Sequence, residues 1–402
     1  MSDEFDPMAG RYTGTAGGLF GLVMHTSLLT LLTFGLYRFW AKTRVRRYIW
    51  SATAPGGDPF EYTGTGLEKF FGFLFAIVIL AVVLGLFQLG LFYAGLSFLN
   101  LGPDSSAWEV NLATFMAQLS VFVILPLIYI AQYRARRYKM SRTRWRGLRF
   151  GMEDGAFGYM VRAIGHSFLT GLTFGLLLPR QTYYLAKYQT DRTWYGNSKF
   201  SIDCGWGVIY PAMKHSLIGV AIILLSGGVS LITPAASVGV IVGYFWLMFG
   251  IVHYRVASYI TLTENTVLGD DIRFGAVPSS FEVVGRIILG SMVVGTLATI
   301  VGGALIAASF FSLGLNFDAI ESGAVPEISP MGAVVAALSL LFTIIFYQAL
   351  NMVFIVQPIT RIIIENTAVL NPDGLRKIRQ REGQDQVDAD GFADALDVGG
   401  AF

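Results

Sequence analysis

Six long stretches of the chain contain no charged side chain, and short charged segments separate them. The stretches are residues 70–103, 110–133, 215–233, 237–254, 287–317 and 328–360. A helix needs about 20 apolar residues, or slightly fewer, to cross a bilayer core roughly 30 Å thick. The pattern therefore predicts a mainly α, polytopic membrane protein with about six spanning helices.

The charges between these stretches predict their orientation. Eight basic residues and no acid directly follow the second stretch, and an excess of Lys and Arg in a short loop marks the cytoplasmic face. They are Arg134, Arg136, Arg137, Lys139, Arg142, Arg144, Arg146 and Arg149. The loops within successive pairs of stretches contain Asp104 and Glu109, then Pro234, then Asp318, Glu321 and Glu327, with no Lys or Arg. We expect three helical hairpins that open to the cytoplasm.

Two shorter apolar segments, residues 19–37 and 163–179, do not fit this alternation. Segment 163–179 lies between two basic loops and is interrupted by Gly165, Gly171, Gly175 and Pro179. A re-entrant or interfacial element is expected, since irregular backbone is tolerated at membrane depth only where protein buries it. The alternative is an eight-helix topology in which the second half is inverted, which would place the basic loop after Arg180 outside.

An internal repeat accompanies the spans. LLTLLTFGLYRFWAKTRVRRY at 28–48 and FLTGLTFGLLLPRQTYYLAKY at 168–188 share residues at one constant offset, which indicates duplication. A second motif, a Thr followed by a Gly turn and a Phe, predicts a short β-hairpin at each occurrence. It recurs at Thr53–Gly57–Phe60, Thr143–Gly147–Phe150, Thr193–Gly196–Phe200 and Thr266–Gly269–Phe274, with 362–369 as a truncated last copy.

These repeats predict the organisation of the chain. Isolated hairpins are marginal in water, so we expect them to join into a β platform on the cytoplasmic side. The predicted units are an N-terminal segment 1–18, membrane repeats 19–133 and 134–260, a truncated repeat 261–370, and a basic-then-acidic disordered tail 371–402.

The strings LTFGLYRFWAKTRVRRY, YRARRYKMSRTRWRGLRFG and ITLTENTVLGD carry a resemblance to a known family. Across residues 11–370 the chain resembles the YjgN-like family of bacterial inner-membrane proteins, whose function is unknown. The resemblance implies a multi-pass protein of the bacterial inner (cytoplasmic) membrane and supplies no catalytic residue. The copy around Arg180 departs from the pattern by replacing the RVRR cluster with TYYLAKY.

Composition excludes a water-soluble globular protein, because 54% of the residues are hydrophobic and only 14% are charged. The formal charge of +2 is unevenly distributed, and residues 382–402 contain six acids and no base. The single cysteine, Cys204, excludes an internal disulfide or a cysteine-built zinc site. The acidic N-terminus, MSDEFDPMAGRYTG, is the wrong polarity for a cleavable signal peptide.

The basic helix ends are the main candidate site. They contain the candidate lipid- or anion-binding residues Arg38, Lys42, Arg44, Arg47, Arg134, Arg136, Arg137, Arg142, Arg144 and Arg146. Each charge near an anionic membrane surface contributes about 1 kcal/mol to lipid binding. The competing interpretation is that these charges only anchor the helices in the correct orientation. Nucleic acid is not an expected partner, because the charges lie within a few residues of the bilayer.

Polar side chains within the apolar segments form a second set: His25, His166, Gln88, Gln118, Gln348 and Asn351. Such groups often mark a pathway, although hydrogen bonds between helices are the commoner explanation. The Gly171/Gly175 and Gly239/Gly243 pairs have a spacing typical of close helix packing. The chain has no HExxH, Walker or GxSxG motif, so no metal, cofactor, catalytic residue or enzymatic activity is expected.

The leading hypothesis is a non-enzymatic protein that binds an anionic lipid or amphiphile in a cytoplasm-facing cavity. The anionic head of this ligand would contact Arg38, Arg44, Arg47, Arg134, Arg137 and Arg144. The entrance to the cavity would be lined by His25 and His166. One alternative is a scaffold that holds a membrane-protein partner through the β platform and the acidic tail. The other is a transporter or channel for a small solute.

Overall fold

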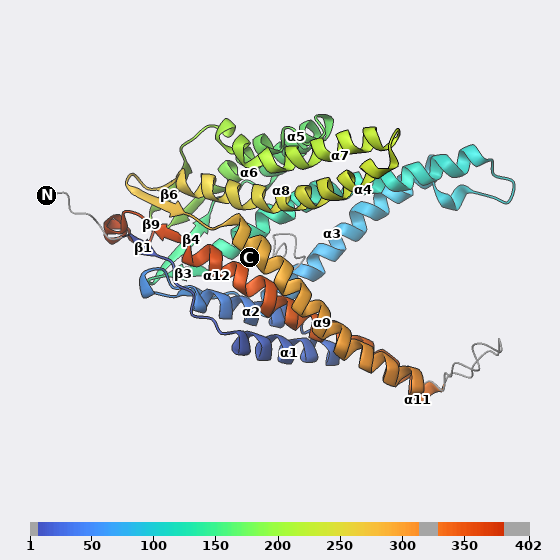
Figure 1. Cartoon of the computed structure of the whole chain (residues 1–402), viewed down its shortest axis with the longest axis horizontal. Coiled ribbons are helices and arrows are strands. Elements are labelled where there is room, and N and C mark those ends of the chain that lie inside the picture. Colours follow the sequence, from blue (N-terminus) through green and yellow to red (C-terminus); the bar gives the residue numbers. More distant parts are fainter. Residues whose placement is uncertain (1–6, 313–328, 382–402) are drawn as a thin grey trace.

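The computed structural model describes residues 7–312 and 329–381. The predicted loop with Asp318, Glu321 and Glu327 and the acidic segment 382–402 lie outside these residues. The described chain consists mainly of helices, and its short strands gather at one end of them (Figure 1).

Six helices are long and apolar enough to cross a membrane, which confirms the number predicted from the uncharged stretches. The spans run over Gly66–Asn100, Ala107–Ser141, Trp206–Ser230, Pro234–Glu264, Ser280–Ser312 and Pro330–Glu365. Their main helices are α3 (Gly66–Tyr93), α4 (Ala107–Ser141), α7 (Lys214–Ser230), α8 (Ser237–Glu264), α9 (Ser280–Ser312) and α11 (Pro330–Asn351). A π-helical turn, Met352–Val356, joins α11 to α12 (Gln357–Glu365). In Figure 1 the α3–α4 and α9–α11 hairpins diverge from the strand end.

Glycines set the distance between α7 and α8. A Cβ added at Gly219 would lie 2.6 Å from the backbone nitrogen of Leu247, and one at Gly243 would lie 2.9 Å from that of Ile223. The two helices therefore touch backbone to backbone, as the Gly239/Gly243 spacing predicts. The same prediction is wrong for Gly171/Gly175, because a Cβ at either position would meet nothing within 4 Å and Gly175 lies in a turn with a φ of 89°.

Nine short strands form one antiparallel sheet, so the predicted hairpins do join. The strand order is β1-β9-β8-β7-β6-β5-β4-β3-β2. The bounds are β1 Met8–Ala9, β2 Phe60–Tyr62, β3 Thr143–Trp145, β4 Leu148–Met152, β5 Thr193–Tyr195, β6 Ser198–Ile202, β7 Thr266–Leu268, β8 Ile272–Ala276 and β9 Thr367–Val369. The cytoplasmic location of this sheet stays a prediction.

The sheet curls until backbone hydrogen bonds join its two edges. The chain that continues from β1 forms a bridge between Tyr12 and Thr53, and the amide of Ala54 donates to the carbonyl of Arg11 over 2.8 Å. On the other side, the amide of Phe60 in β2 donates to the carbonyl of Thr53 over 2.9 Å. Closure leaves few unpaired edge groups, which protects a sheet of very short strands.

The first and last copies of the hairpin motif differ from the prediction. Residues 53–60 form a 3-10 turn, Pro55–Gly57, and the single strand β2, because Thr53 forms an isolated bridge with Tyr12 instead of a strand. In the last copy, residues 362–365 end α12 and only β9 is a strand.

The repeated threonine of the motif caps the helix before it. In each copy the Thr hydroxyl donates to the carbonyl four residues earlier, over 2.6–2.8 Å, at Thr53, Thr143, Thr193, Thr266 and Thr367. The last carbonyls of a helix have no partner within the helix. The threonine satisfies one of them at the point where the backbone changes from helix to strand.

The two shorter apolar segments form helical hairpins, α1 (Ala16–Leu32) with α2 (Arg38–Ala52), and α5 (Ala156–Leu172) with α6 (Leu178–Thr190). The turns share one backbone conformation, with φ near 50° at Phe34 and Phe174 and near 90° at the glycine that follows. Each hairpin begins and ends at a strand of the one sheet. This arrangement is incompatible with the inverted eight-helix alternative; entry of the hairpins into the membrane stays a prediction.

The basic part of the tail is ordered, contrary to the prediction of disorder from residue 371. Residues Pro372–Lys377 form a 3-10 helix, and both Leu375 and Ile378 are buried in the core of the sheet. Apolar side chains spaced among the basic residues explain the difference, because their burial outweighs the entropy of ordering a short segment.

The orientation of the sheet can be tested at Cys204, the only cysteine of the chain. We expect a membrane-impermeant maleimide to label Cys204 from the cytoplasmic side and not from the outside. Burial raises the pKa of this half-buried thiol, so labelling should be slow at neutral pH and faster as the pH is raised. Labelling from the outside in intact cells would reverse the predicted orientation, and solubilised protein provides the control for reactivity.

Candidate functional site

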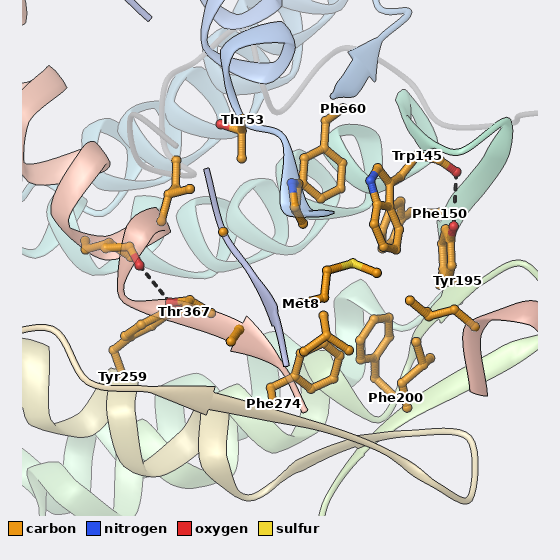
Figure 2. A pocket seen from close by; sticks show the side chains of 18 residues that line it. Met8, Thr53, Phe60, Trp145, Phe150, Tyr195, Phe200, Tyr259, Phe274 and Thr367 are labelled. Carbon is orange, nitrogen blue, oxygen red and sulfur yellow. Dashed lines mark hydrogen bonds between the residues drawn. The ribbon is translucent and has the colours of Figure 1, made fainter. Parts of the chain in front are cut away.

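A cavity of about 290 Å³ lies inside the curled sheet (Figure 2). The phenylalanine of every hairpin motif lines it, namely Phe60, Phe150, Phe200 and Phe274, together with Trp145 and Tyr195. We call this space the aromatic cavity. It lies near the lower end of the size range of small-molecule pockets, which extends over roughly 300–1,000 Å³.

Strand alternation and register aim these rings inward. Successive residues of a strand point to opposite faces, and the register pairs Phe60 with Trp145 and Phe150 with Tyr195. Ring centroids are 6.1 Å apart for Phe60 and Phe150, 6.4 Å for Phe150 and Phe200, and 6.0 Å for Phe200 and Phe274. The motif thus builds a continuous row of rings, one from each copy.

The polar groups of the aromatic cavity are satisfied by the protein. The Tyr195 hydroxyl donates to the carbonyl of Trp145 over 3.0 Å, and burial raises the pKa of Tyr195 to about 12. The hydroxyls of Tyr259 and Thr367 lie 2.9 Å apart (Figure 2). The cavity suits an apolar group such as a hydrocarbon chain.

Helices and the C-terminal segment cover the two ends of the cavity. Tyr259 of α8 and Ile363 and Ile364 of α12 line it at the helix end of the strands. Leu375 lines it from the segment 372–381, which is held at the strand turns. There the amide of Asn197 donates to the carbonyl of Arg379 over 2.8 Å, and the Arg381 guanidinium lies 4.6 Å from the ring of Trp194.

Three buried cations form a second feature, which we call the basic cluster: Arg46 of α2, Lys69 of α3 and Lys139 of α4. Their exposed fractions are 3%, 0% and 5%. Arg46 Nη1 donates to the Tyr62 hydroxyl over 3.2 Å, and Lys69 Nζ lies 5.2 Å from the ring of Tyr62. Lys139 belongs to the last turn of α4, four residues before Thr143, the strand partner of Tyr62.

One carboxylate, Glu68, adjoins this cluster. Its two oxygens accept hydrogen bonds from the Tyr138 hydroxyl over 2.7 Å and from Arg142 Nη2 over 2.8 Å. Glu68 also completes the capping box of α3 with Thr65. Tyr138 of α4 and Arg142 at the C-cap of this helix thus hold the carboxylate beside the basic cluster.

The basic cluster and the aromatic cavity are neighbours on β2. Tyr62 follows Phe60 by two residues, so both side chains lie on the same face of the strand, about 7 Å apart along it. An apolar site and a cationic site are thus adjacent on the concave face of the sheet.

Several of the predicted basic residues join elements of the protein to one another. Arg142 pairs with Glu68, Arg146 Nε lies 2.6 Å from Asp58 and Arg137 Nη1 lies 2.5 Å from Asp154. Arg136 Nη1 donates to Gln189 Oε1 over 3.0 Å. These contacts give a structural role to many of the basic residues in the last turns of α4 and directly after it.

The remaining candidates are distributed around the molecule. Arg38, Arg44 and Arg47 are exposed on α2, and the guanidinium of Arg44 lies 5.7 Å from the ring of Tyr37. Lys42, Arg134 and Arg144 are partly buried. Since Arg38 begins α2 and Arg146 lies in the turn between β3 and β4, the structure does not bring the ten predicted residues to one point.

The sequence prediction did not select Arg46, Lys69 or Lys139 as site residues. In the structure, α2 buries Arg46 on the face of Phe39, Thr43 and Ile49. Lys69 gave a usable signal, because it interrupts an apolar helix one residue after the capping glutamate.

The two histidines proposed to line one entrance lie apart. His166 of α5 stacks on Tyr184 of α6 with a centroid distance of 4.9 Å, and its Nδ1 lies 3.3 Å from Arg180 Nη1. His25 is exposed on α1. Figure 1 shows α1 and α5 on opposite sides of the molecule, so the structure does not bring the two histidines together.

The polar residues predicted within the spans either bond to a neighbouring helix or are at least partly exposed. Gln88 of α3 donates from Nε2 to Ser120 Oγ of α4 over 3.0 Å, which is a hydrogen bond between helices. Gln118 and Gln348 are exposed on α4 and α11, and Asn351 is half-buried. Within residues 7–312 and 329–381, no group of three or more His, Cys, Asp or Glu side chains is placed to hold a metal ion.

Six membrane-length helices attached to one curled sheet define a multi-pass membrane protein. The chain belongs to the family described as "Bacterial protein of unknown function (DUF898)", which it matches over residues 7–241. It is similar to the inner membrane protein YjgN of Salmonella typhimurium (strain LT2), with 36% identity over 75 residues, or 19% of each chain. The match thus spans about a fifth of that relative. No solved structure matches.

These comparisons confirm the family resemblance found in the sequence. The inner-membrane location of the relative and the six apolar helices agree with a multi-pass protein of the bacterial inner membrane. The family description assigns no activity.

Proposed function

We propose that the protein binds an anionic amphiphile from the membrane. Its hydrocarbon chain occupies the aromatic cavity, and its anionic head lies against the basic cluster. With the sheet on the cytoplasmic side, both sites face the inner leaflet, where anionic lipids attract basic segments.

The observation that carries this proposal is the aromatic cavity beside buried cations. An apolar cavity favours a hydrocarbon group, because each buried methylene contributes about 0.8 kcal/mol. Cations beside this cavity favour an anionic head, because opposite charges attract more strongly away from bulk water. The two requirements describe an amphiphile, and the short distance between Phe60 and Tyr62 suits a head joined directly to its chain.

Native mass spectrometry of the purified protein tests the apolar site. We expect Val369→Trp, which fills the cavity, to reduce the retained anionic lipid at least fivefold. Val277→Trp is the matched control, because Val277 follows β8 and is 74% exposed. Val369→Phe provides a milder substitution if the tryptophan prevents folding. Equal lipid retention in all forms would remove the proposal.

The head site is tested in the same assay. Lys139→Gln removes a buried cation and should reduce retention of anionic lipid while leaving zwitterionic lipid unchanged. Arg255→Gln is the control, since Arg255 is an exposed cation near the strand end of α8. A loss of equal size in both variants would indicate a general surface-charge effect and would contradict a specific head site.

A further inference from the structure

We infer that the tips of the two short helical hairpins insert into the hydrocarbon of the membrane leaflet beside the sheet and stop there without crossing the bilayer. The tips are the turns between α1 and α2, residues 33–37, and between α5 and α6, residues 173–177. Acyl chains of lipid are the partner of both surfaces. This inference does not depend on the amphiphile proposed above, because it concerns the outer surface of the protein.

Both tips expose apolar side chains that nothing in residues 7–312 and 329–381 covers. Phe34 and Phe174 are each 98% exposed. The leucines around them are more than half exposed, namely Leu32, Leu36, Leu172 and Leu176. Residues 28–37 and 168–179 contain no charged side chain. Clustered, exposed apolar side chains mark a surface that contacts another protein or a membrane.

The backbone holds each phenylalanine outward in an unfavourable conformation. The φ angle is 50° at both Phe34 and Phe174, in the left-handed region, where the Cβ of a non-glycine residue crowds the backbone. In both turns the amide of the next glycine donates to the carbonyl of the threonine five residues earlier, over 2.7 Å. Contacts of the exposed rings within the described protein do not compensate for this conformation. Burial of the rings in hydrocarbon supplies the missing stabilisation.

Contacts with the spans place the second tip at membrane depth. The Thr182 hydroxyl of α6 lies 2.6 Å from that of Tyr254, the last residue of an uncharged stretch on α8. The Ser167 hydroxyl of α5 lies 2.6 Å from that of Tyr129, near the end of the uncharged stretch on α4. Phe174 is seven or eight residues further from the sheet, which is at most about 12 Å at 1.5 Å per helical residue. One leaflet has a hydrocarbon thickness of about 15 Å, so the tip ends inside it.

The contacts of α2 place the first tip at membrane depth as well. Phe39 packs on Phe73 of α3 with ring centroids 5.1 Å apart. Phe73 lies in the first turn of the uncharged stretch that begins at residue 70. Phe34 is five residues further from the sheet than Phe39, so the tip lies beyond the start of this apolar surface.

Arginines limit the depth of both tips. Arg38 is exposed on α2, four residues after Phe34, and Arg180 of α6 follows Phe174 by six residues. An arginine at this position keeps its guanidinium at the headgroups by extending its side chain along apolar surface. The Arg38 guanidinium accordingly lies 6.0 Å from the ring of Phe73. Crossing the bilayer would carry both charges through its core, so the tips stop within one leaflet.

Spin-label accessibility in the full-length protein tests the insertion. In a Cys204→Ser background, Phe34→Cys and Phe174→Cys receive a nitroxide, and the protein is reconstituted into vesicles of phosphatidylethanolamine and phosphatidylglycerol. The ratio of accessibility to oxygen over accessibility to a water-soluble nickel chelate is measured. We expect this ratio to be several-fold higher at both tips than at Val277→Cys, which is 74% exposed directly after β8. Val78→Cys, 58% exposed on α3, provides the ratio for a spanning helix.

Two results of this measurement would overturn the inference. One is a ratio at the tips as low as at Val277→Cys, which would place the tips in water. The other is low accessibility to both reagents, which would indicate that another protein surface covers the tips.

Crossing is tested with an impermeant maleimide on the same variants, without spin label, in intact cells and in inverted membrane vesicles. Val277→Cys should react from one side only, which identifies the side of the sheet. The tip cysteines should react from neither side and should react after solubilisation in SDS. Labelling of a tip from the side opposite to Val277→Cys would show that its hairpin crosses the membrane, and the inference would be lost.

The depth limit is tested by Arg38→Leu in the protein labelled at residue 34. Removal of the charge should let the tip move deeper and raise the ratio of oxygen to nickel accessibility. Arg44→Leu is the matched control, because Arg44 is exposed on the same helix six residues nearer the sheet and should leave the ratio unchanged. An identical ratio with and without Arg38 would contradict its role in limiting the depth.

Discussion

Glu68→Gln is expected to destabilise the protein by about 2–4 kcal/mol, because it removes the carboxylate that adjoins the basic cluster. Glu68 accepts charged or hydroxyl hydrogen bonds from Arg142 and Tyr138, and it lies beside Lys69 in sequence. Glutamine keeps the size and an acceptor oxygen but not the charge. This loss of stability is smaller than for a fully buried ion pair, because the Glu68 side chain is 34% exposed.

Glu109→Gln is the matched control for this prediction. Glu109 occupies the same capping-box position at the start of α4, where it interacts with Ser106 and is exposed. Its loss should cost at most about 1 kcal/mol, as for other surface cap residues. Thermal unfolding followed by tryptophan fluorescence in one detergent measures both changes. Equal shifts in melting temperature would show that Glu68 acts only as a helix cap.

The membrane architecture could be predicted from the sequence because the bilayer sets a fixed length for apolar helices. The uncharged stretches 110–133 and 237–254, for example, fall within spans of the structure. The joining of the hairpins into a sheet was also predictable, because short strands need neighbours. In both cases a local pattern was sufficient.

Long-range contacts could not be predicted in this way. β1 is only two residues long, Met8–Ala9, so no periodic signal marks the strand that closes the sheet. The partners of Arg142 and Arg146 lie 74 and 88 residues away. Counting basic residues therefore indicated orientation but did not show which cations the protein itself neutralises.

The sequence predicted only part of the structural role of the repeated Thr–Gly–Phe motif. Thr, Gly and Phe at fixed spacing predicted a turn and a strand, and the turn glycines do have positive φ, for example 78° at Gly147. Which face of each strand carries the phenylalanine depends on how the sheet curls. The aromatic cavity therefore became apparent only when Phe60 and Phe274 from distant copies met on one concave face.

Gly250→Val is expected to separate α7 from α8 and to cost about 3 kcal/mol or more through overpacking. A Cβ at Gly250 would lie 2.5 Å from the backbone nitrogen of Ser216 and 2.7 Å from its Cα. These are backbone atoms, so no side-chain rotation relieves the clash. Gly219 and Gly243 hold the same two helices at close distance, and the strain cannot be relieved by a local shift.

Gly303→Val in α9 is the control, because Gly303 is exposed and a Cβ there would meet nothing within 4 Å. It should change stability by less than about 1 kcal/mol, the usual range of helix propensity. Unfolding by SDS in mixed micelles measures both variants. Because α8 carries Tyr259 of the aromatic cavity and leads into β7, Gly250→Val should also lower lipid retention, while Gly303→Val should not. Equal stability of the two variants would contradict backbone contact between α7 and α8.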